Sequence, residues 1–133
     1  STDYFEANYK AFSGLDPGAP AAVQAYDAGA IMGLATIIAG KGDAAAIKAA
    51  IPKVVDPNGT VIHAGKDEFA KAIGLIKEGK PIKYEGVIGP ISFDQYGDIT
   101  GPFRLWKITD GKVTTVSQMS TDDVNALKAK IGN

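Results

Sequence analysis

The stretch VIGPISFDQYGDITGPFRLWKITDGKVTTV, residues 87–116, decides the fold class, because it is the part of the chain that has the composition of strands. Three short segments in it are rich in β-branched and aromatic residues, which is typical of strands: 87–93, 103–108 and 112–116. Asp110-Gly111 lies between the last two and predicts a tight hairpin. Trp106 is expected to be a core residue on its strand.

The segment between the first two strands carries two aspartates and invites three interpretations. A calcium loop needs oxygen ligands at alternate positions and a distant glutamate, and neither follows Asp94. A catalytic pair of Asp94 and Asp98 with His63 lacks a nucleophile and an orienting group. The pattern favours a turn in which Gly97 takes a positive φ and the aspartates bond to nearby backbone. No catalytic residue, metal site or cofactor is predicted.

The chain outside this stretch is dominated by helical patterns. Four helices are expected before it and one after it, over 2–14, 21–39, 43–51, 66–79 and 120–131. Asp3 and Glu6 have the spacing of a capping box, Asp43 is placed to cap the third helix, and Pro52 is expected to disrupt it. Residues 54–65 are expected to form a loop.

The second of these helices is apolar on all sides. The stretch 20–39 is long enough to cross a membrane, but Asp27 inside it and the many alanines and glycines favour a buried helix of a soluble protein. Asp27 is expected to cap or to pair locally. A ridge of small residues recurs every fourth position, at Ala21, Ala25, Gly29 and Gly33, and would let another backbone approach closely.

Composition excludes several classes of function. The chain has 133 residues, a formal net charge of −1 and no cysteine. A near-neutral chain has no basic field to attract nucleic acid, so no nucleic-acid partner is expected. The length predicts a single domain, 1–133. The opening residues, STDYFEANYK, show no signal peptide.

Residues 84–113, YEGVIGPISFDQYGDITGPFRLWKITDGKV, resemble the C-terminal region of branched-chain amino-acid ABC transporter substrate-binding proteins, of the type I periplasmic-binding family. The family has G-x-x-G-P-[hydrophobic]-x-F-D-x-x-G-D followed by a strand and a DG hairpin. FEANYKAFSGLDPGAPAAVQAYDAGAIM, residues 5–32, is similar to its Y-D-A helix pair, and GKDEFAKAIGLIKEGKPIKYEG, residues 65–86, is similar to the segment that follows in one large subgroup.

The resemblance implies an α/β fold that is a partial lobe of a type I periplasmic-binding protein. The isolated chain would be α+β, with N-terminal helices, a short strand and hairpin region, and a C-terminal helix. Family members are two-lobed and several hundred residues long, so this chain would be a C-terminal fragment. The implied function is capture of a small ligand, a branched-chain or related amino acid or a similar small polar solute, between two lobes and its delivery to a membrane permease.

The resemblance also implies one site residue, a location and partners. Tyr26 occupies the place of an aromatic that lines the ligand pocket in family members; the other interpretation is that Tyr26 is a core aromatic. The implied location is the periplasmic or extracellular face of a bacterial membrane. The implied partners are the ligand and the ABC permease, and no enzyme activity is expected.

The alternative function is a self-contained oligomerising or regulatory domain derived from the same fold, without a role in transport. The apolar second helix and the strand edges of 87–116 would be uncovered in an isolated fragment. We therefore expect the chain to form a homo-oligomer.

Overall fold

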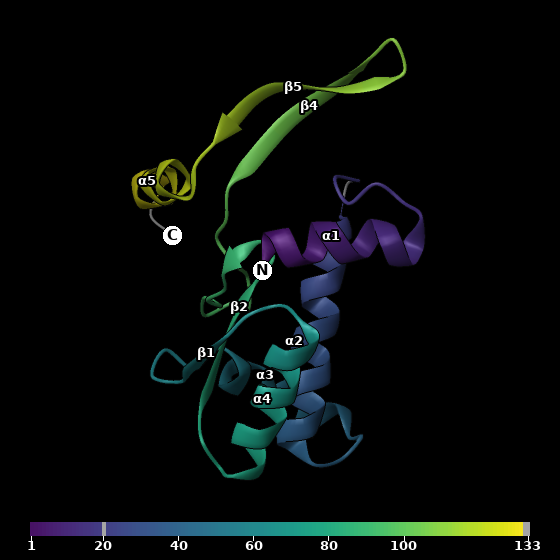
Figure 1. Cartoon of the computed structure of the whole chain (residues 1–133). Helices are drawn as coiled ribbons and strands as arrows, with labels where there is room; N and C mark the ends of the chain where they lie inside the picture. The colour runs from purple at the N-terminus through teal and green to yellow at the C-terminus, as the bar shows by residue number, and fades with distance from the viewer. Residues whose placement is uncertain (20, 132–133) are drawn as a thin grey trace. The chain divides into compact units, whose positions relative to one another are not determined.

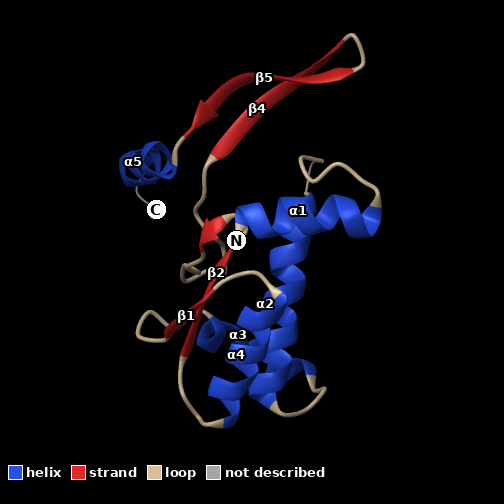
Figure 2. Ribbon diagram, viewed as in Figure 1, coloured by secondary structure: helices blue, strands red, loops and turns tan. Residues whose placement is uncertain are grey.

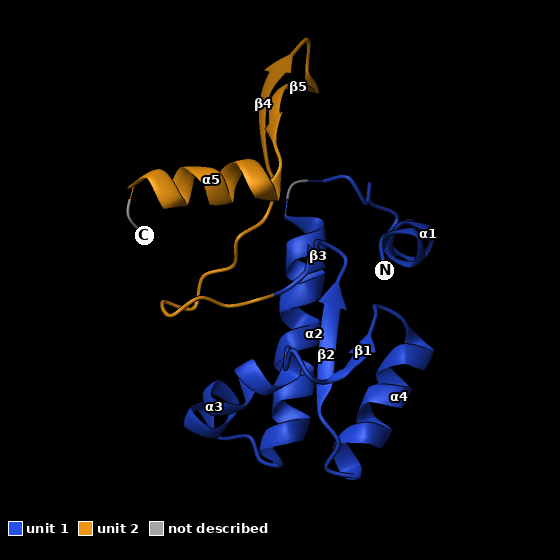
Figure 3. Cartoon of the chain, turned by 90° about the vertical axis from the view of Figure 1, so that its left-hand side faces the viewer, with its two compact units in different colours: residues 1–91 blue, residues 92–133 orange. Residues whose placement is uncertain are grey.

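The computed structural model describes residues 1–19 and 21–131, which divide into two compact units, 1–91 and 92–133 (Figures 1 and 3). The described residues form a mixed α+β fold (Figure 2). The helices are α1 (Thr2–Ser13), α2 (Ala22–Ala39), α3 (Ala44–Val54), α4 (Lys66–Lys77) and α5 (Thr121–Ile131). The strands are β1 (Thr60–Ile62), β2 (Ile82–Gly86), β3 (Gly89–Pro90), β4 (Phe103–Thr109) and β5 (Lys112–Met119).

The first unit contains a small mixed sheet with the strand order β1-β2-β3. β1 and β2 are parallel, with Thr60 opposite Ile82, and α4 connects them. β3 returns antiparallel to β2. The loop predicted over 54–65 is therefore wrong in part, because it contains β1. The strand predicted over 87–93 is also displaced, since the pairing lies in β2 and β3.

The two faces of β2 differ in chemistry. Ile82 and Tyr84 are almost fully buried, whereas Lys83 and Glu85 alternate with them and form an ion pair of 3.0 Å on the other face. Tyr84 contacts α2 through Asp27 and α4 through Phe69, so both helices lie on the same face of the sheet. The core of the first unit is between that face and the helices.

The helix ends follow the predictions in part. Asp43 caps α3 as expected, accepting a bond of 2.8 Å from the Ala46 N–H. The capping box at Asp3 and Glu6 is wrong: Ser1 is the N-cap of α1 and makes no capping bond there. Pro52 does not end α3, which continues to Val54. The fully buried Val54 gives the last turn a packing contribution that opposes the cost of a proline so near the helix end.

Helix α2 is covered on only one side. Its buried residues are Asp27, Ile31, Leu34 and Ala35, while Met32 is 48% and Ile37 38% exposed. The predicted ridge of small residues lies on the exposed side. By length and composition alone α2 is long and apolar enough to cross a membrane. Core helices of soluble proteins meet the same two criteria. Pro20, where the apolar stretch begins, lies outside the described residues.

The second unit consists of a turn, a hairpin and α5. The turn prediction is confirmed: the Asp94 N–H donates to the Asp98 carbonyl at 2.9 Å, and Gly97 has φ 87°. β4 and β5 form the predicted hairpin, with positive φ at Asp110 and Gly111. The prediction that Trp106 is a core residue is wrong, since it is 44% exposed.

Candidate functional site

Tyr26 lies in the middle of a row of aromatic rings that joins three helices to the sheet. Its ring centroid is 5.3 Å from that of Phe5 on α1 and 6.4 Å from that of Phe69 on α4. Phe5 also stacks on Tyr9, and Phe69 lies 6.0 Å from Tyr84 on β2. Contacts of this length are typical of favourable aromatic pairs. The row is therefore part of what holds α1, α2 and α4 on the sheet.

Tyr26 also lines a groove between α2 and α4. The groove has a volume of about 490 Å³, within the range of small-molecule sites. Its lining has no charged side chain and consists of Ala25, Tyr26, Gly29, Ala30, Gly33, Leu34, Ile37, Phe69 and Ile73. Tyr26 is thus a packed aromatic and a lining residue at once. An apolar side chain would suit this groove, but the lining has no charged side chain to pair with an amino or carboxylate group.

Asp27, next to Tyr26 in the sequence, is buried and is 2% exposed. Its Oδ1 accepts hydrogen bonds from the Tyr84 hydroxyl at 2.8 Å and the Val87 N–H at 2.9 Å, and its Oδ2 accepts from the Ile88 N–H at 2.9 Å. The expectation that Asp27 pairs locally is wrong, because these donors lie some 57 to 61 residues along the chain. Asp27 fixes α2 to the turn between β2 and β3.

Two neighbouring residues, Tyr84 and Gly86, accommodate the Asp27 carboxylate. Burial raises the pKa of the Tyr84 hydroxyl, and the hydrogen bond to Asp27 raises it further, so Tyr84 remains a donor. Burial also raises the pKa of Tyr26, with Tyr4 and Asp27 adding to the effect. A Cβ at Gly86 would collide with the Asp27 carboxylate, so only glycine fits at this point of β2.

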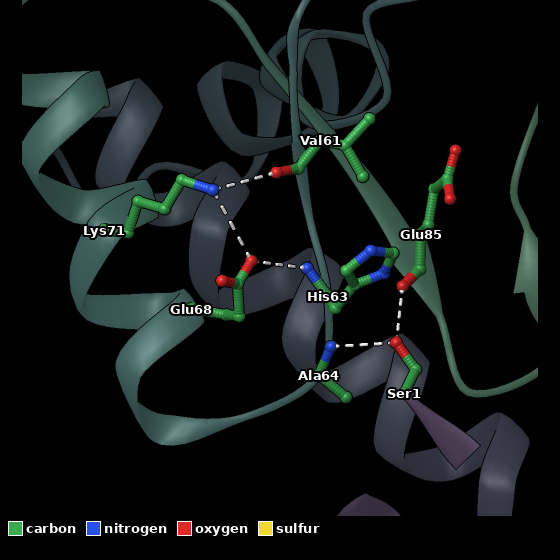
Figure 4. A network of polar contacts seen from close by, with 7 residues as sticks. All are labelled: Ser1, Val61, His63, Ala64, Glu68, Lys71 and Glu85. Atoms are coloured by element: carbon green, nitrogen blue, oxygen red, sulfur yellow. Dashed lines mark hydrogen bonds and ion pairs between the residues drawn. The ribbon is translucent and has the colours of Figure 1, made fainter. Parts of the chain in front are cut away.

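A second polar network lies at the ends of β1 and β2 (Figure 4). The Ser1 Oγ donates to the Glu85 carbonyl and accepts from the Ala64 N–H, both at 3.0 Å. The His63 N–H donates to Glu68 Oε2 at 3.0 Å, and His63 itself is exposed. Ser1 therefore joins the start of α1 to both parallel strands.

Asp94 and Asp98, considered above as a catalytic pair, meet only within their turn. Asp94 Oδ1 accepts from the Tyr96 and Asp98 N–H groups at 2.9 and 3.0 Å, and these bonds lower the pKa of Asp94. Lys128 lies 3.6 Å from Asp94 Oδ2 and ties α5 to the turn. Within 1–19 and 21–131, no three His, Asp or Glu side chains gather closely enough to hold a metal ion.

Comparisons with known proteins add no further assignment. No family model matches the chain, and no match was found among the curated proteins or the solved structures. The groove beside Tyr26 is consequently the candidate site on geometry alone. The sequence pointed to Tyr26 but not to Phe69 and Ile73 of α4, which also line the groove.

Proposed function

We propose that the chain is part of the solute-binding component of an ABC transporter, located at the periplasmic or extracellular face of a bacterial membrane. It captures a small ligand, a branched-chain or related amino acid or a similar solute, and delivers it to a membrane permease. The mechanism needs no covalent chemistry. A ligand that contacts two lobes at once stabilises their closed arrangement, and the permease recognises that arrangement.

The observation that carries the proposal is the coincidence of the family-like motif with a boundary between compact units. The motif runs through 84–113, and the chain passes from one unit to the next between Ile91 and Ser92. A receptor that closes by hinge bending needs segments that connect two separately packed bodies. The finer fold proposal, a partial lobe of the type I periplasmic-binding fold, rests on the same motif.

The groove beside Tyr26 supports the nature of the ligand. Its apolar lining suits a branched aliphatic side chain, which gains roughly 0.8 kcal/mol for each buried methylene. The polar ends of an amino acid would be bound by residues outside this chain. Affinity for the isolated chain is accordingly expected to be weak.

The test is an NMR titration of the 133-residue chain with leucine and isoleucine, with aspartate as the control ligand. The aliphatic amino acids should shift the ring resonances of Tyr26 and Phe69 with a dissociation constant of about 1 mM or weaker, roughly −4 kcal/mol. Tyr26→Ala should abolish the shifts. Tyr9→Ala removes a ring of the same row that does not line the groove and should preserve them.

Two outcomes would contradict the proposal. Equal shifts with aspartate would show that the groove does not select apolar side chains. Micromolar binding of leucine to this chain would show that a second lobe is not needed. In the latter case the alternative function, a self-contained domain, would be favoured. That alternative draws support from the exposed apolar residues of the β4–β5 hairpin.

A further inference from the structure

The sheet of the first unit has a free edge at β1, and side chains from α4 close it (Figure 4). The Thr60 N–H donates to the Pro81 carbonyl, so Thr60 faces β2. Backbone groups of successive strand residues point to opposite sides, which places those of Val61 and His63 on the outer edge. Lys71 Nζ donates to the Val61 carbonyl at 3.3 Å, and Glu68 accepts from the His63 N–H.

These contacts block the addition of a strand at β1. Lys71 and Glu68 occupy the positions that the backbone of a further strand would take, and their charged groups lie 3.8 Å apart. Charged side chains at a sheet edge are a common protection against pairing with another chain. The protein therefore protects one of its sheet edges by direct hydrogen bonds.

The β4–β5 hairpin of the second unit has no such protection. Within residues 92–131, no side chain hydrogen-bonds to the backbone of β4 or β5, and every residue of both strands is exposed. A two-stranded sheet on its own is marginally stable in water. Both of its faces carry apolar side chains: Phe103, Leu105 and Met119 on one, and Trp106, Ile108 and Val113 on the other. This hairpin needs further cover.

The two outer edges of the hairpin are not equivalent. β4 follows Pro102 and carries Arg104 and Lys107, which oppose pairing with a copy of itself. β5 has no charged residue and no proline from Val113 to Met119 and consists largely of β-branched and small polar residues. The outer edge of β5 is thus the one suited to strand addition.

We propose that β5 pairs with β5 of a second copy of this chain, antiparallel and centred on Thr114. A two-fold axis normal to the sheet then sets Thr114 opposite Thr114 and Val113 opposite Thr115. The register of β4 and β5 shifts at one point: Leu105 pairs with Ser117 and Trp106 with Thr115, so Val116 has no partner on β4. The proposed pairing uses the residues of β5 that precede this shift.

The second copy is favoured over another partner because β5 is complementary to itself. No like charges lie opposite each other, and β-branched pairs across strands are stabilising. The two hairpins become a four-stranded sheet in which Ile108, Val113 and Thr115 of both copies continue one apolar strip. This pairing does not depend on the transport proposal.

The first test is disulfide cross-linking, which is unambiguous because the chain has no cysteine. Residues directly opposite in an antiparallel pair have Cβ atoms about 4.5–5.5 Å apart, close enough for a disulfide after small adjustments. Thr114→Cys should oxidise to a covalent dimer rapidly. Thr109→Cys, an exposed cysteine on β4 of the same hairpin, should do so much more slowly. Equal rates would overturn the proposal.

The second test is sedimentation equilibrium at micromolar concentration. The wild-type chain and Thr114→Val should be dimers, whereas Thr114→Lys, which sets two ammonium groups opposite each other, should be monomeric. Circular dichroism identifies any variant that is unfolded, and the cross-linking pair then decides the outcome. A monomeric wild-type chain, or a Thr114→Lys variant that dimerises as well as the wild type, would overturn the proposal.

Discussion

Asp27 is a buried carboxylate that forms no ion pair with any side chain in the part of the chain that the structure describes. Burying an unpaired charge is costly, and proteins tolerate it where hydrogen-bond donors satisfy the oxygens. Here a tyrosine hydroxyl and two backbone N–H groups provide them, and bonds to a charged acceptor are the stronger kind. Because these donors come from β2 and the turn after it, a single side chain fixes the position of α2 on the sheet.

Removing this carboxylate should be among the most destabilising single changes in the first unit. Asp27→Ala leaves Tyr84, Val87 and Ile88 without an acceptor and should lower the free energy of unfolding by about 3–5 kcal/mol. Tyr84→Phe removes one donor and leaves two, so a loss of about 1–2 kcal/mol is expected. Urea unfolding followed by circular dichroism measures both. Equal losses would mean that the bonds to Val87 and Ile88 contribute nothing.

The sequence alone could not assign Asp27 this role. An aspartate in an apolar helix indicates that some partner is needed, but its partners are set by the tertiary fold and not by helical spacing. Tyr26 shows the same limit. The sequence presented two interpretations, ligand pocket and core. The ring packs against Phe5 and also lines a groove, so its packing is set by the tertiary fold and the ligand pocket stays a prediction.

Elements with strong local signals were predicted well, and those that depend on distant pairing were not. The helices and the Asp110-Gly111 hairpin follow from periodicity, caps and turn chemistry. β1 has only three residues and follows a turn, so its sequence shows no alternation of apolar and polar residues. It is a strand because it pairs in parallel with β2. β2 has the alternating sequence I-K-Y-E-G, but five residues are too few to distinguish a strand from a loop between two elements.

The glycines of two elements give opposite predictions. Gly86→Ala should destabilise the first unit by about 1–3 kcal/mol, because the added methyl group collides with Asp27 in a packed site. Gly74→Ala should stabilise it by up to about 1 kcal/mol, since nothing lies within 4 Å of that position in α4 and alanine favours helix. Thermal unfolding of both variants tests the prediction. A stabilising Gly86→Ala would contradict the arrangement of Asp27 against β2.

At the scale of the whole molecule, the buried residues are distributed unequally. Among residues 1–19 and 21–131, the first unit contains every buried hydrophobic residue except Val124, and also the aromatic row and the buried Asp27. The second unit has Val124, a turn fixed by Asp94 and an ion pair with Lys128. Exposed ion pairs contribute little to stability, so the second unit lacks a core that could support it alone.

The first unit should therefore fold when it is produced as residues 1–91. Its sheet, the helices α1 to α4 and the three bonds to Asp27 all lie within this range, and Ile91, buried at its end, is retained. We expect a cooperative urea transition with nearly the same midpoint as that of the full chain. Residues 92–133 alone should show no cooperative transition at low concentration, because a hairpin with two exposed faces is marginal. An unfolded 1–91 fragment would mean that contacts made by the second unit supply stability that the first unit's own core does not.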